Sequence, residues 1–195
     1  MKRLGKNYEE AKAYTDSERL PAGGYVLKIE DVKYEAGQEG KSDVIIFRFD
    51  IAEGDYTGFF RKNFEENIQE DKKWRGTYRL YVPKDDGSEQ DSWTMKRFKT
   101  VMNAFEDSNR EYHWNWDEMT LKGKLVGALF NDKEYSFKGR HGFFTNCHSL
   151  IPAERIRKGN FKIPEPTMLK KGLDLPQDSS GFMNIPDGTE EAIPF

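Results

Sequence analysis

Apolar and polar residues alternate along residues 25–34, as they do in a strand with one buried face. From Tyr25 to Ile29 the residues assigned to the buried side have odd numbers, and from Val32 onward they have even numbers. This change of phase predicts a β-bulge near residues 30 and 31. Such a bulge curls a sheet toward a barrel.

Two further segments are predicted to be strands of the same antiparallel sheet. Residues 45–51 alternate most clearly and place Arg48 on the polar face. Residues 59–64 are predicted to bury Phe60 and Phe64 and to turn Phe59 and Arg61 outward. The alternative is that a loop covers Phe59 and that Arg61 is an ordinary solvated charge.

A polar hairpin is predicted to be inserted after the third strand. Its second half, residues 77–83, alternates so that Arg79 and Tyr81 are exposed. Trp74 and Arg75 come just before this segment and add another ring and another cation. The alternative is an amphipathic hairpin with Trp74 as its lid.

A helix follows the hairpin. Apolar residues at steps of three and four predict a helix that runs to about Glu106, with Asp91 or Ser92 as its N-cap. Trp114 and Trp116 then lie in a predicted loop. There they either stack on bases or plug one end of a barrel.

The last part of the predicted sheet is a second hairpin. Residues 124–130 are predicted to be a strand, residues 131–134 a turn, and residues 135–138 and 143–151 the final strands. The loop between these final strands is bounded by glycines. Rings and cations cluster on this hairpin, namely Tyr135, Phe137, Lys138, Arg140 and His141.

This order of elements predicts a mainly-β fold, an OB-fold-like antiparallel barrel with one helix and an inserted hairpin. Another small barrel or an α+β sandwich is the alternative. Residues 1–23 are interpreted as an N-terminal arm and residues 24–163 as the OB-like domain. Residues 164–195 hold five of the eight prolines without sustained periodicity, which predicts a disordered acidic tail.

The distribution of charge matters more than the total. The formal net charge is −3, but residues 164–195 hold two lysines against six acids, a net of −4. Subtracting −4 from −3 leaves +1 for residues 1–163, so the total does not exclude a nucleic-acid partner. A single cysteine, the lack of a long apolar segment and a start unlike a signal peptide predict a cytoplasmic protein without membrane contact.

Motifs for catalysis and for metal binding are absent from the sequence. It has no P-loop, no GxSxG, no HExxH and no paired CxxC. His113, His141, His148 and Cys147 do not follow the spacing of zinc ligands. Neither an enzyme nor a cofactor or metal site is therefore expected.

Rings beside cations suit an unpaired nucleic-acid strand, because rings stack on bases and cations neutralise phosphates. Stacking contributes about 1–3 kcal/mol per base in such grooves, so a few rings suffice despite the small net charge. The residues predicted to bind the strand are Arg48, Phe59, Arg61, Trp74, Arg75, Arg79, Tyr81, Tyr135, Phe137, Lys138 and Arg140.

The final nine residues, DGTEEAIPF, combine acids with an apolar anchor. This pattern is typical of a short linear ligand whose aromatic residue fills an apolar pocket while its acids meet cations. The residues predicted to bind a partner are Glu190, Glu191, Ile193, Pro194 and Phe195. The tip resembles the acidic C-terminal tip of bacterial single-stranded DNA-binding proteins, which recruits replication, recombination and repair enzymes. It departs from that pattern in having glutamates in place of an aspartate run and Ala192 before the anchor.

The body of the chain resembles a group of bacteriophage-encoded early proteins thought to bind single-stranded DNA. The likeness lies in the stretches LPAGGYVLKIEDV, LKGKLVGALF and IRKGNFKIPEP. It implies a protein that binds and protects single-stranded DNA with little sequence specificity during phage replication and recombination in the bacterial host. The alternative is a non-enzymatic structural or adaptor protein of the phage that uses the barrel for protein contacts. A homo-oligomer is compatible with either function.

Overall fold

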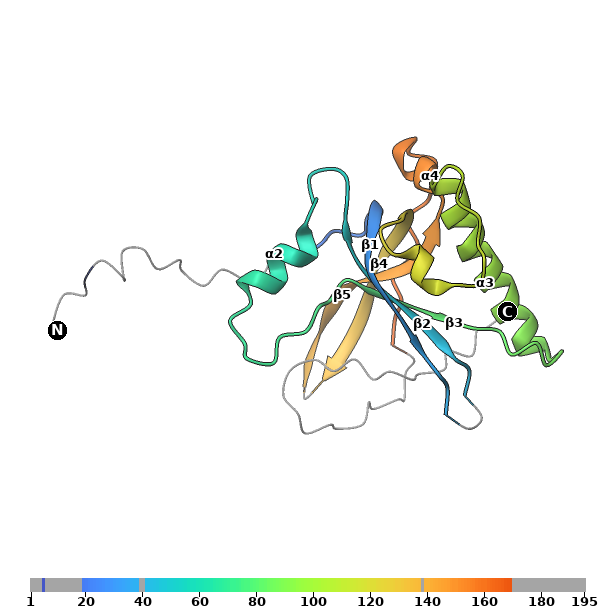
Figure 1. Cartoon of the computed structure of the whole chain (residues 1–195). Coiled ribbons are helices and arrows are strands. Elements are labelled where there is room, and N and C mark those ends of the chain that lie inside the picture. Colours follow the sequence, from blue (N-terminus) through green and yellow to red (C-terminus); the bar gives the residue numbers. More distant parts are fainter. Residues whose placement is uncertain (1–4, 6–18, 39–40, 138, 170–195) are drawn as a thin grey trace.

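The structure of the chain is a computed structural model that describes residue 5 and residues 19–38, 41–137 and 139–169. This part is mainly β, with an open antiparallel sheet of five strands and three α-helices around it (Figure 1). The strands are β1 (Gly23–Glu35), β2 (Val44–Ile51), β3 (Thr77–Tyr81), β4 (Leu125–Phe137) and β5 (Arg140–Ile151). The helices are α2 (Phe59–Glu66), α3 (Glu89–Ser108), the 3-10 turn η1 (Glu118–Leu121) and α4 (Ala153–Arg157).

The strands lie in the order β3-β2-β1-β4-β5, so β1 is central and β3 and β5 form the two edges. The register between β1 and β2 shifts between Ile29 and Asp31, which confirms the predicted bulge. Figure 1 shows strands that cross one another at a marked angle, as a strongly twisted sheet does.

One face of the sheet forms the core with α3. This helix buries Phe98, Val101, Met102 and Phe105, and the Phe105 ring lies 5.5 Å from that of Phe47 on β2. The N-cap is Ser88, three residues before the earliest predicted N-cap, because the Ser88 hydroxyl accepts a hydrogen bond from the Asp91 backbone N–H at 3.1 Å.

Residues 59–64 form the helix α2, so the prediction of a strand there is wrong. Gly58 has φ 74°, and the buried Asp50 carboxylate accepts backbone hydrogen bonds from Phe60 at 3.0 Å and Arg61 at 3.1 Å. A carboxylate at a helix N-terminus satisfies N–H groups that have no partner within the helix. The third strand is therefore residues 77–81, and the predicted inserted hairpin is replaced by α2 and a connecting loop.

Residues 131–134 continue β4, so the predicted turn is also wrong. The Asn131 side-chain amide donates to the Glu165 carbonyl at 2.8 Å and to the Thr167 hydroxyl at 3.0 Å. Thr167 also pairs with Lys133 as a parallel bridge beside β4. Residues 164–169, which the sequence assigned to the tail, thus belong to the folded body.

Candidate nucleic-acid interface

The second face of the sheet carries polar and charged side chains over β1, β2 and β3. Residues paired across neighbouring strands point to the same face, so the register defines three rows of side chains. We call this surface the outer face. Its rows are Asp31, Arg48 and Thr77; Lys33, Ile46 and Arg79; and Glu35, Val44 and Tyr81.

The other half of this same face is covered. A Cβ on Gly24 would lie 2.6 Å from the Phe161 ring, and one on Gly127 would lie 2.8 Å from Ile156. Glycine at these two positions lets α4 and the segment after it pack directly on the backbone of β1 and β4. These segments do not cover the outer face over β1 to β3, where Lys33, Arg48 and Tyr81 are exposed although Val44 is buried.

Arg48 and Trp74 form an aromatic and cationic pair at the first row of the outer face. The Arg48 guanidinium lies 5.5 Å from the centroid of the Trp74 ring. The Trp74 indole N–H donates to the Phe49 carbonyl at 3.0 Å, and its ring lies 5.7 Å from that of Phe64 in α2. Backbone and helix thus hold the indole in place, and the indole supports the exposed guanidinium.

Three acids of β1 pair with cations from several elements. Glu35 lies 2.7 Å from Lys33 and 3.6 Å from Arg79 of β3. Its pKa is held below the ordinary value, chiefly by the hydrogen bond from Lys33. Glu30 lies 3.4 Å from Arg61 of α2.

Asp31 is paired in the same way at the β-bulge. Its carboxylate lies 3.3 Å from the Lys122 ammonium in the turn that leads into β4. The hydrogen bond from Lys122 is the main cause of its lowered pKa, with smaller contributions from the charges of Lys122 and Arg48. Asp31 and Glu35 are therefore carboxylates at neutral pH, each in contact with a cation.

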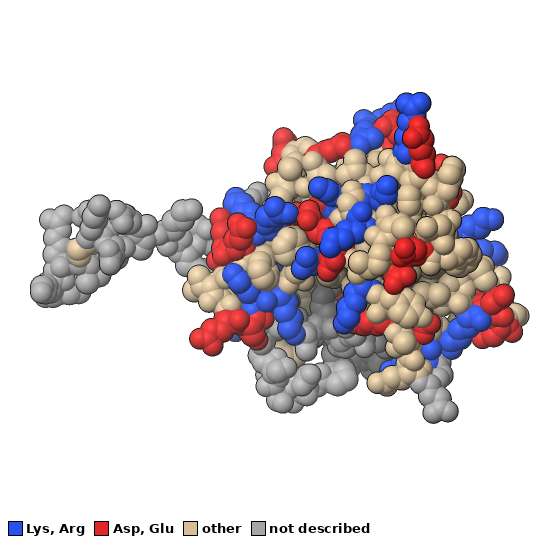
Figure 2. Space-filling view, in the orientation of Figure 1, with Lys and Arg blue, Asp and Glu red and all other residues tan. Residues whose placement is uncertain are grey.

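The charges are mixed over the whole visible surface as well. Figure 2 shows lysine and arginine side chains gathered over the middle of the molecule, where Figure 1 has β1 and β2. Acidic side chains lie among them. This arrangement supplies contacts for phosphates without forming a uniformly basic stripe.

The structure brings several of the predicted binding residues together. Arg48, Arg79 and Tyr81 lie on the outer face itself, and the Tyr81 side chain is 46% exposed. Trp74 supports Arg48, and the exposed Arg75 follows it directly before β3. Arg61 lies in α2, not in a strand, but it reaches β1 through its ion pair with Glu30.

Other predicted binding residues lie elsewhere. Phe59 packs on the core beside Tyr56 and Phe60, so it is not an outward ring of a strand. Tyr135, Phe137 and Arg140 lie on the hairpin of β4 and β5, on the other side of β1 from β2 and β3. The Tyr135 ring lies 6.3 Å from that of Phe144. Lys138 and the tip residues 187–195 lie outside the described residues.

Sequence reasoning missed several members of the outer face. Lys33 and Ile46 follow from the alternation of β1 and β2 once the bulge is fixed, so their signal was present in the sequence. Lys122 is far from these strands in sequence and reaches Asp31 only through the fold. No local pattern indicates that contact.

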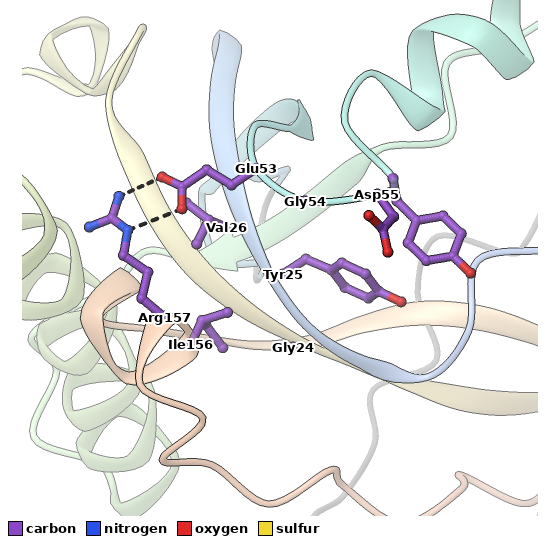
Figure 3. Close-up of a pocket in the computed structure, with 9 residues that line it drawn as sticks. Gly24, Tyr25, Val26, Glu53, Gly54, Asp55, Ile156 and Arg157 are labelled. Atoms are coloured by element: carbon purple, nitrogen blue, oxygen red, sulfur yellow. Dashed lines mark hydrogen bonds and ion pairs between the residues drawn. The ribbon is translucent and has the colours of Figure 1, made fainter.

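A separate pocket of about 370 Å³ lies between the start of β1, the loop after β2 and α4 (Figure 3). Glu53 and Arg157 close one side, with guanidinium to carboxylate distances of 2.6 and 3.1 Å. Tyr25 and Asp55 line the rest, and burial raises the pKa of Tyr25 to about 12. Since Arg157 is already bound by Glu53 and Glu154, the pocket offers carboxylates and is unsuited to a phosphate.

Within residues 19–38, 41–137 and 139–169, no three His, Cys, Asp or Glu side chains come together as a metal site requires. None of the helices in these ranges combines the length and the apolar character needed to cross a bilayer.

The outer face is the described surface that best fits an extended, charged ligand. No protein-family model matches the chain, and no curated protein is significantly similar to it.

Proposed function

We propose that the chain binds single-stranded DNA across its outer face, without strong sequence preference and without catalysis. The observation that carries the proposal is the exposed Arg48 guanidinium held over Trp74 in the first row, with Arg79 and Tyr81 in the two rows that follow it. Cations and rings at neighbouring positions of an open sheet are what an unpaired strand needs.

We further propose that the five-stranded sheet forms an OB-like barrel, and the topology supports this. An OB-fold is a partly open, five-stranded Greek-key barrel that binds oligonucleotides over strands 2 and 3. The order β3-β2-β1-β4-β5, the bulge in β1 and the helix α3 between β3 and β4 are compatible with such a barrel opened between β3 and β5.

The chemistry of the face favours contacts that do not depend on base identity. Arg79 and Lys33 supply cations for phosphates, and Tyr81 supplies an exposed ring for a base. The guanidinium plane of Arg48 can stack on a base with the side that does not face Trp74. Stacking uses the π-face that every base has, so little sequence preference is expected.

The sequence of the tip supports a second part of the proposal. Acids followed by Ile193, Pro194 and Phe195 would recruit enzymes of DNA replication, recombination or repair during phage growth in a bacterial host. Pull-down from host lysate with the wild-type chain and a Phe195→Ala variant tests this part. Equal capture of such enzymes by both proteins would contradict it.

A titration of a fluorescently labelled oligo-dT, followed by anisotropy at low and high salt, tests the DNA-binding part. We expect binding that weakens as salt rises, because phosphate contacts release counterions. The double variant Arg48→Ala, Arg79→Ala should bind at least about tenfold more weakly. Arg110→Ala removes an arginine that lies after α3 and is paired only loosely with Glu111, so it should bind like the wild type. No wild-type binding at low salt, or equal losses in both variants, would refute the proposal.

One observation favours a second candidate, a protein adaptor. Trp116 is 75% exposed with φ 66°, and its ring stacks on that of Phe98 at 6.2 Å. A large exposed ring held in an uncommon backbone conformation is typical of a contact surface. An adaptor would show no affinity for oligo-dT at any salt, and Trp116→Ala would abolish capture of its protein partner.

A further inference from the structure

We infer that Glu30, Asp31 and Glu35 act as internal counterions, which an incoming DNA backbone displaces from the cations of the outer face. This inference rests on the proposed function. It concerns how binding is limited, and not whether it occurs.

All three carboxylates lie on β1, the central strand, and the cations paired with them belong to elements that surround β1. Arg61 comes from α2, Arg79 from β3, and Lys122 from the turn before β4. Each cation is thus held at the outer face by an acid of the same strand.

A carboxylate and a phosphate compete for the same donors. Both are anionic oxygen groups that accept hydrogen bonds from guanidinium and ammonium, so a cation held by one is less available to the other. Asp31 is 44% exposed and its partner Lys122 is 54% exposed, so their ion pair is solvated. Pairs of this kind contribute little to stability, and a phosphate can replace the carboxylate without disturbing the fold.

The β1 acids also have a use before DNA arrives. Long side chains of arginine and lysine lose conformational freedom when they are fixed in one place. The acids fix these side chains over the face in advance. The same ion pairs lower affinity, so DNA should exchange more readily than on a face with cations alone.

The test measures oligo-dT affinity for Asp31→Asn and Glu35→Gln at low salt. Each variant keeps the shape of the side chain and removes its charge. We expect each to bind about twofold to fivefold more tightly than the wild type, the range that a surface ion pair allows. Asp107→Asn is the matched control, since it removes one exposed acid from α3, which packs on the opposite face of the sheet. Its affinity should equal that of the wild type.

A double-mutant cycle separates displaced ion pairs from simple repulsion of DNA by acids. In a Lys122→Ala background, the gain from Asp31→Asn should shrink, because the cation that Asp31 holds by a hydrogen bond is gone. A gain of the same size in both backgrounds, or no gain beyond the Asp107→Asn control, would overturn the inference while leaving the proposed function intact. If neither the wild type nor any variant binds oligo-dT, the proposed function itself fails.

Discussion

Substitutions of Trp74 should distinguish its contribution to the stability of the fold from its contribution to DNA binding. The indole links three elements, because it donates to the Phe49 carbonyl of β2, packs against Phe64 of α2 and lies under Arg48. Trp74→Ala removes all three contacts. Trp74→Phe keeps a ring and loses only the N–H donor.

The expected magnitudes follow from these contacts. A fully buried Trp→Ala change costs about 3–5 kcal/mol, and Trp74 is half-buried, so we expect the free energy of unfolding to fall by about 2–3 kcal/mol. For binding, the lost support of Arg48 is worth about 0.5–1 kcal/mol and base stacking about 1–3 kcal/mol. Affinity for oligo-dT should therefore fall about tenfold to several-hundredfold in Trp74→Ala. It should fall only a few-fold in Trp74→Phe.

Urea unfolding followed by circular dichroism gives the stability change, and anisotropy with labelled oligo-dT gives the binding change at a temperature where the variants are folded. Trp93→Ala is a matched control. Trp93 is an exposed indole of α3 with the Lys96 ammonium 4.9 Å from its ring, so it repeats the ring and cation away from the outer face. Binding by Trp74→Ala that matches the wild type, or an equal loss in Trp93→Ala, would refute the reasoning.

Three further predictions concern the fold and the tail. Asp50→Ala leaves two N–H groups of α2 without their charged acceptor, so it should lower the free energy of unfolding by about 3 kcal/mol. The exposed cap change Ser88→Ala should lower it by only about 1 kcal/mol. Urea titrations that give a similar small loss for both variants would contradict this prediction. The hydrogen bond from Arg157 lowers the pKa of Glu53, so its stabilisation is present above the ordinary pKa of 4.5 and is lost as pH falls through the folded pKa. Glu53→Gln should then cost about 0.5–1 kcal/mol at neutral pH and nothing in acid, and a loss that persists in acid would exclude the ion pair as its cause. Deleting residues 170–195 should tighten oligo-dT binding at low salt, because it removes acids that compete with DNA, and unchanged or weaker affinity would exclude that competition.

The alternation of apolar and polar residues predicted a strand correctly when one face of that strand is buried and the other is exposed. β1 and β2 were predicted correctly, including the bulge, because the sides of the sheet differ strongly in polarity there. The segment 59–64 failed because Phe60 and Phe64 are four residues apart, a spacing that suits both a strand and a helix. The deciding contact is the carboxylate of Asp50, which accepts hydrogen bonds from the first turn of α2.

The polar segment 131–134 shows a second limit of predicting structure from local sequence. Asn131 and Asp132 are typical turn residues, yet here they bind distant parts of the chain. Asn131 holds residues 165 and 167, and Asp132 lies 2.8 Å from Arg19. Polar residues that serve tertiary contacts cannot be distinguished from turn residues by their identity.

The candidate site shows why net charge was a poor guide to its function. A body charge of +1 treats every cation as equally available, whereas Arg61, Arg79 and Lys122 each lie beside an acid of β1. When a phosphate binds one of these cations, the cation leaves its carboxylate. The free energy gained is therefore the difference between the cation–phosphate and the cation–carboxylate ion pair, and not the full energy of a new ion pair. Affinity should then depend on which acids face the cations and on how exposed each pair is. Both are set by the register of β1 against its neighbours, and a one-residue slip at the bulge would turn Lys33 and Glu35 toward the core and remove the site.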